Sequence, residues 1–309
     1  MVGIGTEGSK APLLSVIVLQ WDQVHHTRRC VDSIREGTDV DYELIIVDNG
    51  SEPPGRMYAA DTADVVVQHD RNLGFAGGMN AGLRQARGSV VAFVNNDTTL
   101  PSGWAFPLVQ LLETDSSIGI VTPAISASGP SVQTHPDPGD SVLIVNPFSQ
   151  PPSAVVWLMR TATVRALGGF DERFWPASAE DLDLAFTVWI NELDIVTDTR
   201  VRVGHIGKGT ATEKLDSWRQ VWKRNGEMLL DKWSDTDEQK PRLDSVDQVR
   251  HARNTAIAAS MALWMRRYYD LRERRFRGRL LVDRAISRGE AARRRLVTRL
   301  TDGGKTHRQ

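Results

Sequence analysis

The first two-thirds of the chain alternate between short apolar runs and segments whose apolar residues recur at helical intervals. The runs are rich in β-branched residues and predict buried strands, whereas spacings of three and four predict helices. The predicted strands are 13–19, 43–47, 63–68, 89–94, 118–125 and 155–159, and the predicted helices are 26–36, 77–86, 102–113 and 180–191. This alternation predicts an α/β fold with a mainly parallel, Rossmann-like sheet that helices cover on both faces.

Three polar patches adjoin these apolar segments. The residues Asp48–Ser51 follow the second strand, Asn95–Asp97 follow the fourth, and Glu180–Asp183 begin the last helix of the series. Each patch alone is equally typical of a turn or a helix cap. Because ligands of open α/β sheets bind at the carboxyl edge, three patches there favour a nucleotide, a divalent metal and a catalytic base. The sequence therefore indicates group transfer from an activated donor.

The remaining segments differ in character from this alternating part. The stretch 126–152 is rich in Pro, Ser, Gly and Asp and is interpreted as a long surface excursion. We expect a tail over 1–12, a catalytic domain over 13–210, a lid and helical linker over 211–243, and a basic amphipathic helical region over 244–309.

Charge is distributed unevenly along the chain. Residues 250–309 hold 17 basic and 5 acidic side chains, a net charge of +12, which leaves −13 for the rest. Such a segment indicates an anionic partner. Three hypotheses stand for it: peripheral contact with an anionic membrane surface, packing on the acidic domain, or a homo-oligomer contact. Binding of nucleic acid beside a vestigial enzyme domain is an alternative from another class, which the absence of a recognisable nucleic-acid module disfavours.

Composition is that of a globular protein of 309 residues, with 40% hydrophobic and 25% charged residues. The single cysteine, Cys30, has no internal disulfide partner and is expected to be a buried thiol in a reducing compartment. No stretch approaches the ~20 apolar residues that span a bilayer, and 11–20 is better explained by a strand than by a signal segment. We therefore expect a cytoplasmic protein.

Six ordered motifs carry a resemblance to a known family. They lie at 14–18, 45–51, 72–78 with Asn80, 93–98, 168–174 and 180–184. With these motifs, residues 13–210 resemble the family 2 glycosyltransferases of the GT-A fold, particularly the bacterial rhamnosyltransferase-like members. The resemblance implies an α/β GT-A domain, a nucleotide-sugar donor and a divalent cofactor, Mg²⁺ or Mn²⁺.

The resemblance assigns the metal site to two residues. Asp97 matches the last residue of the family's Asp-x-Asp motif, and His205 stands where members often place a further metal or diphosphate ligand. Asn95 replaces the first Asp of that motif, as in many rhamnosyltransferase-like members, so the site has one negative charge fewer. Asn95 and Asn96 are then expected to contact the donor.

The resemblance also assigns the base and the acceptor side. Transfer to a hydroxyl with inversion needs a carboxylate that accepts the proton, and Asp181 matches that position. Glu180, Asp183 and Trp175 are then expected to position the site or to contact the acceptor. Asp183 is equally typical of a helix cap.

Donor contacts are expected from the first two strands. Trp21 stands where the family places an aromatic ring against the pyrimidine, although a core tryptophan is the alternative. Asp48 and Asn49 match the pyrimidine and ribose contacts. Asp22 stands where many members have Asn, and its role is left open.

The segment after the third strand is the remaining donor region. Arg71, Asn72, Gly77 and Asn80 are assigned to the donor, because glycines allow close backbone approach and arginine binds phosphate. A tight strand-to-helix turn packed on Phe75 is the alternative. The function implied by the whole pattern is inverting transfer of a sugar, with dTDP-rhamnose first and UDP-sugars second, to a saccharide or lipid-linked acceptor.

Overall fold

The computed structural model describes residues 11–127, 141–145, 154–206 and 218–234. Both ends of the predicted lid and helical linker (211–217 and 235–243), most of the excursion at 126–152 and the basic region at 244–309 lie outside the described residues. The expectations for the membrane, the oligomer and nucleic acid, all of which depend on the basic region, therefore stay predictions. Within the described helices, none is both long enough and apolar enough to cross a membrane.

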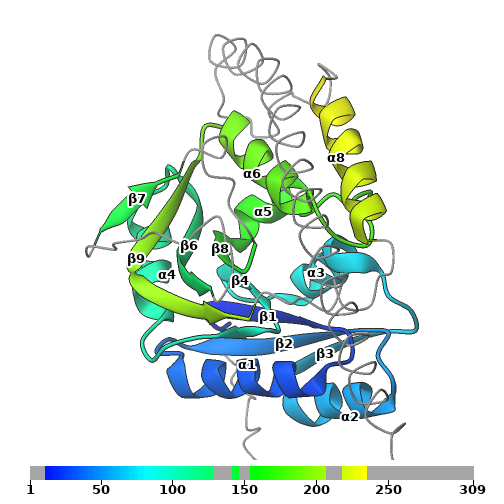
Figure 1. Cartoon of the computed structure of the whole chain (residues 1–309). Helices are drawn as coiled ribbons and strands as arrows, with labels where there is room; N and C mark the ends of the chain where they lie inside the picture. Colours follow the sequence, from blue (N-terminus) through cyan, green and yellow to red (C-terminus); the bar gives the residue numbers. More distant parts are fainter. Residues whose placement is uncertain (1–10, 128–140, 146–153, 207–217, 235–309) are drawn as a thin grey trace, which may run out of the picture. The chain divides into compact units, whose positions relative to one another are not determined.

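One mixed sheet forms the centre of the domain (Figure 1). Its order is β3-β2-β1-β4-β8-β6-β9-β5, and β7 also pairs with β9. The strands are β1 (Leu14–Gln20), β2 (Tyr42–Asn49), β3 (Val65–His69), β4 (Val90–Asn95), β5 (Thr98–Thr99), β6 (Ile118–Ala127), β7 (Val142–Ile144), β8 (Val156–Arg160) and β9 (Asp194–His205).

Strand direction divides the sheet into two parts. The side β3-β2-β1-β4 is parallel throughout, as the alternation of strands and helices predicts, and β6 pairs in parallel with β9. Strand β8 runs antiparallel to both β4 and β6, and β5 and β7 run antiparallel to β9. The predicted fold class is confirmed, with the antiparallel β8 joining two parallel groups.

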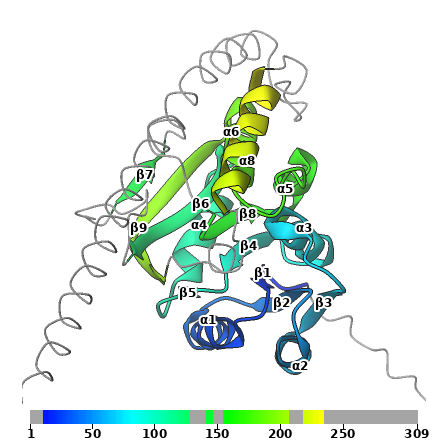
Figure 2. The same cartoon turned by 45° about the vertical axis from the view of Figure 1, so that its right-hand side comes forward.

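Helices cover both faces of the sheet. They are α1 (Val24–Gly37), α2 (Pro53–Thr62), α3 (Gly74–Gln85), α4 (Ala105–Thr114), α5 (Thr161–Leu167), α6 (Glu180–Ile190) and α8 (Trp218–Ser234). Figure 1 shows α1 and α2 on one face of β1, β2 and β3, and α3 on the other. Both views place α8 alongside α6 (Figure 1 and Figure 2).

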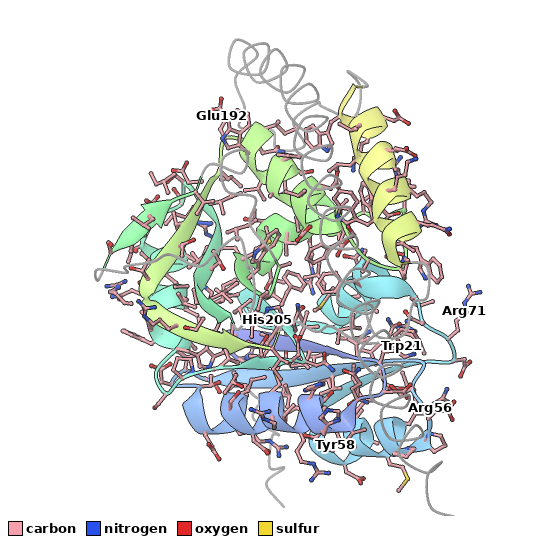
Figure 3. The ribbon with its side chains drawn as sticks, in the orientation of Figure 1. Trp21, Arg56, Tyr58, Arg71, Glu192 and His205 are labelled. Carbon is pink, nitrogen blue, oxygen red and sulfur yellow. The ribbon has the colours of Figure 1, made fainter. Side chains whose placement is uncertain are left out.

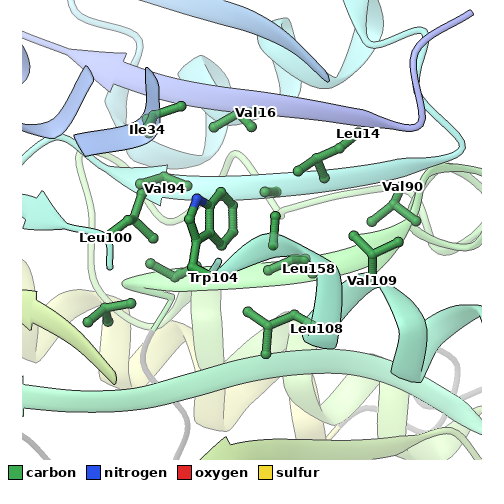
Figure 4. Close-up of a cluster of buried hydrophobic side chains, with 14 of the residues drawn as sticks. Leu14, Val16, Ile34, Val90, Val94, Leu100, Trp104, Leu108, Val109 and Leu158 are labelled. Carbon is green, nitrogen blue, oxygen red and sulfur yellow. The ribbon is translucent and has the colours of Figure 1, made fainter. Parts of the chain in front are cut away.

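Two hydrophobic cores follow from the alternation of side chains along the strands. On one face, Leu14, Val16 and other strand residues pack with α1 and α4 around Trp104, which is fully buried (Figure 4). On the other face, Ile17 and Phe93 pack with α3, α5 and α6. Cys30 lies in the first core, and burial raises the pKa of its thiol well above the usual range. The prediction of a buried thiol is confirmed.

Helix α3 carries glycine at two positions that face the sheet. A Cβ atom on Gly78 would lie 2.3 Å from Cδ1 of Leu19, and one on Gly82 would lie 2.5 Å from Cγ2 of Ile17. A side chain at position 82 would thus collide with the β-branched Ile17, whereas one at position 78 would displace the end of the flexible Leu19 side chain.

Several elements have no counterpart among the ranges predicted from the sequence pattern. They are α2, α5, the short strands β5 and β7, and the long strand β9. Helix α2 begins with two prolines, Pro53 and Pro54, a sequence that is also typical of a turn. Strand β7 lies within the 126–152 stretch that was interpreted as an excursion, and its three residues pair with β9. Helix α4 begins three residues later than predicted, where Asp39 Oδ1 accepts the backbone N–H groups of Ala105 and Phe106.

Candidate active site

The first two polar patches lie at one edge of the sheet. Gln20 at the end of β1 pairs in register with Asp48 of β2, and Leu19 pairs with Asn95 of β4. Parallel pairing thus places Asp48 and Asn95 on either side of the end of β1. The predicted gathering of these two patches at the carboxyl edge is confirmed.

Asp48 presents a buried carboxylate oxygen at this edge. Its side chain is fully buried, and Oδ1 accepts a hydrogen bond from Gln20 Nε2 at 3.3 Å. Among the described residues Oδ2 has no hydrogen-bond partner, and Nε of Arg56 lies 4.0 Å from it. A buried acceptor is costly unless a donor reaches it, so a ligand N–H group would stabilise Asp48.

Trp21 and Asp22 follow the end of β1. Figure 3 shows Trp21 on the same side of the domain as Arg56 and Arg71, with Arg71 pointing into solvent. Trp21 is partly buried. Asp22 links two turns: its N–H donates to Ser51 Oγ at 2.8 Å and its Oδ1 accepts the N–H of Glu52 at 2.7 Å.

Asn49 uses its amide to hold the turn between β3 and α3. Its Nδ2 donates to Asn72 Oδ1 at 2.9 Å and to the carbonyl of Gly74 at 3.0 Å, while its Oδ1 accepts the N–H of Leu73 at 2.9 Å. Asn72 Oδ1 also accepts the N–H of Gly74 at 2.7 Å. In this structure both amides, which the sequence assigned to the donor, position the turn.

The predicted metal residues lie next to each other. Nε2 of His205 is 3.2 Å from Oδ1 of Asp97, because β5 pairs with β9 and places Thr98 opposite His205. Asp97 is 6% exposed, and its Oδ2 has no hydrogen-bond partner within the described ranges. An orphaned carboxylate oxygen beside an imidazole nitrogen fits a divalent cation.

The two asparagines before Asp97 differ in their surroundings. Asn95 is half-buried at the end of β4, and its N–H donates to the carbonyl of Val155 at 2.9 Å. Asn96 is 9% exposed and donates from Nδ2 to Thr27 Oγ1 at 3.1 Å. In the part of the chain that the structure describes, no group of three or more His, Cys, Asp or Glu side chains forms a complete metal site.

Asn80 ties α3 to the 168–172 motif. Its Oδ1 accepts the N–H of Phe170 at 2.9 Å, and its Nδ2 donates to the Phe170 carbonyl at 2.8 Å and to Glu172 Oε1 at 3.0 Å. A Cβ atom on Gly169, whose φ is +71°, would lie 2.5 Å from Asn80 Oδ1. The side chain of Asn80 is thus engaged within the protein. Gly77 lies close to the same motif, since a Cβ atom on it would be 3.8 Å from Glu172 Oε2.

Trp175 belongs to the segment that leads into α6 and lies against the start of α3, since a Cβ atom on Gly74 would be 2.9 Å from its Cδ1. Its side chain is 47% exposed, which is rare for tryptophan, and its Nε1 donates to the carbonyl of Asn72 at 3.5 Å. The following carbonyl, that of Pro176, accepts the N–H of Phe75 at 2.6 Å. The segment that leads into α6 is therefore fixed to the turn that Asn49 holds.

The third polar patch forms the first turn of α6. Glu180 is 5% exposed, and burial together with the charge of Asp181 raises its pKa well above the usual range. Asp181 is half-buried, and its Oδ1 accepts the N–H of Leu182 at 2.9 Å. Carboxylates in a first turn are favoured by the helix dipole. Asp181 is the more accessible of the two neighbouring carboxylates.

Asp183 binds α8 instead of facing the strand ends. Its Oδ2 accepts a hydrogen bond from Lys232 Nζ at 2.8 Å, and its Oδ1 accepts one from Trp233 Nε1 at 3.0 Å. Lys232, 7% exposed, also donates to Asp171 Oδ2 at 2.7 Å. Although burial alone would raise it, hydrogen bonds from Arg173 and Lys232 hold the pKa of Asp171 well below its usual range.

A pocket of about 330 Å³ opens beside this ion pair. Its lining joins the start of the 168–172 motif to the end of α8, through Asn80, Asp171, Asp183 and Lys232 among others.

Two further residues of α8 contact the segment before α6, and the sequence did not reveal them. Asn225 Nδ2 donates to the carbonyls of Ala177 and Ser178, each at 3.0 Å. Arg224 donates to the carbonyl of Trp175. Helix α8 falls within the predicted lid and helical linker at 211–243. Its apolar spacing does not show that a polar pair on it reaches another loop.

The fold is that of the GT-A glycosyltransferases. A crystal structure of GalNAc-T7 with UDP, GalNAc and Mn²⁺ superposes with a TM-score of 0.56, at 16% identity, over 85% of this chain and 58% of that one. The crystal structure of TarS residues 1–349 from S. aureus in complex with UDP gives a TM-score of 0.56 at 14% identity, over 79% of this chain and 70% of that one. At these identities the likeness concerns the fold.

The sequence comparisons match part of the chain to a family. Residues 15–160 match the family model described as Glycosyl transferase family 2. The uncharacterized glycosyltransferase EpsJ of Bacillus subtilis is 33% identical over 95 residues, which are 29% of this chain and 28% of EpsJ. The match thus spans less than a third of that relative. Together these findings support a glycosyltransferase domain of family 2.

Proposed function

We propose that the chain is an inverting glycosyltransferase that moves a sugar from a pyrimidine nucleotide-sugar to a hydroxyl of a saccharide or glycolipid acceptor. One observation carries the proposal: in the buried carboxylate of Asp97, Oδ1 lies 3.2 Å from Nε2 of His205, while Oδ2 has no hydrogen-bond partner among the described residues. Asp97 lies just past the end of β4, at the sheet edge where Asp48 holds a second orphaned oxygen.

The nucleotide is assigned to the end of β1 and β2. The imide N–H of uracil or thymine is a donor that matches the buried Oδ2 of Asp48, and the accessible part of Trp21 offers a face for stacking. Arg71, exposed on the same side, supplies a cation for phosphate (Figure 3). Both dTDP and UDP carry the imide, so these contacts select a pyrimidine and not the sugar.

Two donors are ranked by different arguments. dTDP-rhamnose comes first because the six motifs resemble rhamnosyltransferase-like proteins most. UDP-sugars come second, supported by the two structural neighbours that were solved with UDP.

Asp97 and His205 fit a divalent cation, Mg²⁺ or Mn²⁺, since both side chains offer lone pairs. Among the described residues, Oδ2 of Asp97 has no hydrogen-bond partner. When bound, such a cation neutralises the charge that develops on the leaving diphosphate. With Asn95 in place of a carboxylate, the protein contributes one negative charge fewer, and the diphosphate oxygens contribute more of the ligand charge.

Asp181 is assigned as the general base. The acceptor oxygen forms a bond to the anomeric carbon while the bond to the diphosphate breaks, and the hydroxyl proton passes to the Asp181 carboxylate. Burial first, and the charge of Asp181 second, raise the pKa of the neighbouring Glu180, which favours the neutral form of Glu180 beside the proposed base.

The acceptor side is assigned to Trp175. Its half-exposed ring lies in the segment that leads into α6, and aromatic faces pack against the C–H faces of sugars. Asp183, which the sequence also assigned to this side, acts through α8, because both its oxygens accept hydrogen bonds from Lys232 and Trp233.

The test is a donor panel that measures release of nucleoside diphosphate with and without Mn²⁺. We expect turnover of one pyrimidine nucleotide-sugar and loss of transfer in Asp181→Asn, with nucleotide binding within about twofold of the wild type. Full turnover by Asp181→Asn would show that another residue is the base. Absence of binding for every donor would remove the proposed function.

A further inference from the structure

The segment that precedes α6 has a backbone that its residues do not favour. Ser178 has φ +87° and Ala179 has φ +80°. Both values lie in the left-handed region, which residues other than Gly and Asn rarely adopt. Helix α6 begins after Ala179 without a side-chain cap. Such a conformation persists only where surrounding contacts hold it. The position of Asp181, in the first turn of α6, therefore depends on those contacts.

Asn225 of α8 supplies contacts at this point. It is fully buried, and its Nδ2 donates to the carbonyls of Ala177 and Ser178 at 3.0 Å each, with the Trp175 carbonyl at 3.5 Å. One side-chain amide group thus meets three backbone carbonyls of the segment. The two closest belong to the residues immediately before Ala179.

Arg224 fixes the orientation of that amide. Its Nε and Nη2 donate to Asn225 Oδ1 at 3.1 and 2.9 Å, and its Nη2 also donates to the carbonyl of Trp175. Because the guanidinium only donates, it selects the oxygen of the amide and leaves the NH₂ group for the carbonyls.

Two other contacts hold the segment before α6 and the first turn of α6. The N–H of Phe75 donates to the carbonyl of Pro176, and a Cβ atom on Gly74 would lie 2.7 Å from that oxygen. Two residues past Asp181, Asp183 accepts hydrogen bonds from Lys232 and Trp233 of α8. Helix α8 therefore contacts the chain both before and after Asp181.

We propose that Asn225, oriented by Arg224, is a positioning residue that places the Asp181 carboxylate for proton abstraction. The proposal rests on the proposed function, in which Asp181 is the base. Asn225 and Arg224 lie on α8 and do not belong to the proposed nucleotide site. That site is formed at the ends of β1 and β2 by Gln20, Trp21 and Asp48. Loss of the amide should therefore lower kcat and leave nucleotide affinity unchanged.

The first variant is Asn225→Asp, which keeps the shape and places an oxygen where the NH₂ group meets the carbonyls. We expect kcat to fall by at least about tenfold, since a displacement of ~1 Å at a reacting group costs up to ~100-fold. Binding of UDP and dTDP should stay within about twofold. Hydrogen exchange over 174–184 should become faster, while exchange in β1 and β2 stays as in the wild type.

Leu229→Ala is the matched control. Leu229 lies one turn further along α8, is fully buried, and has no hydrogen-bonding side chain. We expect a lower melting temperature with kcat unchanged well below melting. If Leu229→Ala lowered kcat as much as Asn225→Asp, loosening of α8 as a whole would explain the effect, and the proposal would be wrong.

Arg224→Met provides the second variant, because Arg224 is exposed and its replacement is compatible with folding. We expect Arg224→Met to lower kcat a few-fold. The double variant Arg224→Met/Asn225→Asp should be no slower than Asn225→Asp alone, since both substitutions act through the amide of Asn225. Unchanged kcat, or unchanged exchange over 174–184, in a folded Asn225→Asp variant contradicts the proposal. If the wild type turned over no donor, the proposed function would fail on its own, and faster exchange would still show that Asn225 holds the segment.

Discussion

Nε2 of His205 lies 3.2 Å from Oδ1 of Asp97, and a strand of two residues brings them together. Strand β5 begins directly after Asp97 and pairs with the last residues of β9, so that Thr98 lies opposite His205. The backbone N–H of Ile206 also donates to the carbonyl of Asp97 at 3.2 Å. The end of β9 is thereby attached to the turn that carries the predicted metal ligand.

The first prediction concerns removal of that ligand. Asp97→Asn takes away the orphaned carboxylate oxygen and should weaken Mn²⁺ binding and transfer, each by at least about 100-fold. Titration of Mn²⁺ in the transfer assay measures both. Asp61→Asn, at an exposed position of α2, makes the same change of charge and should leave the titration unchanged. Equal Mn²⁺ dependence in the wild type and Asp97→Asn would exclude Asp97 as a ligand.

The second prediction concerns Asn95, which stands where the resembled family has an Asp. Asn95→Asp adds a carboxylate near Asp97, so the protein should lose stability without metal through like-charge repulsion and regain it with Mn²⁺. Thermal melting with and without Mn²⁺ should show a larger metal-induced rise than in the wild type. A rise no larger than that of the wild type would mean that the side chain at position 95 does not face the cation.

The third prediction follows from the buried carboxyl of Glu180. Burial first, and the charge of Asp181 second, raise its pKa in the folded state. At a pH between the two pKa values of Glu180, the folded protein binds more protons than the unfolded chain. The contribution of Glu180 to stability is therefore complete below its pKa in the unfolded chain, and it is lost as the pH rises through its pKa in the folded protein. The slope for one proton is at most about 1.4 kcal/mol per pH unit.

Glu180→Gln tests this sign. The variant should match the wild type in acid and exceed its free energy of unfolding at neutral and basic pH, because the neutral amide has no charge to bury. Denaturant unfolding from about pH 4 to about pH 9 measures the difference. A difference that stays constant across that range would contradict the raised pKa of Glu180.

The fourth prediction concerns Lys232, whose ammonium lies 2.7 Å from Asp171 Oδ2 and 2.8 Å from Asp183 Oδ2. Lys232→Met leaves two carboxylates without their cation, and breaking a buried pair costs about 3–5 kcal/mol. Lys223→Met on the same helix removes only an exposed pair with Glu227 and should cost less than about 0.5 kcal/mol. Similar losses in the two variants would mean that Lys232 adds nothing beyond a surface charge.

The sequence predicted which residues lie at the carboxyl edge of the sheet, because the end of a strand is marked by neighbouring residues in the sequence. Apolar runs followed by polar residues mark strand ends, and parallel pairing then brings Asp48 and Asn95 together without further information. The amides of Asn49 and Asn80 show what such reasoning leaves out. Their donor contacts stay predictions, but motif position alone did not reveal that these amides also bind backbone groups of the 72–74 turn and of the 168–174 motif.

The roles of α8 could not be predicted for a related reason. Its amphipathic spacing identified a helix, but the partners of Asn225 and Lys232 lie some 50 to 60 residues earlier in the chain. Periodicity reports which face is apolar and does not report which loop a polar side chain meets. The contacts of β5 with β9 were missed likewise, because a strand of two residues has no detectable pattern.

The last prediction tests the proposed nucleotide site through Asp48. A hydrogen bond to a charged acceptor contributes about 1.5–3 kcal/mol, so Asp48→Asn, which lacks one carboxylate oxygen, should weaken binding of UDP and dTDP by roughly 10- to 150-fold. Asp70→Asn is the matched control: its fully exposed side chain also lies 4.0 Å from Arg56 and should change binding little. Calorimetry without a sugar donor measures both variants independently of turnover. Equal affinity in Asp48→Asn and Asp70→Asn would place the pyrimidine away from the end of β2.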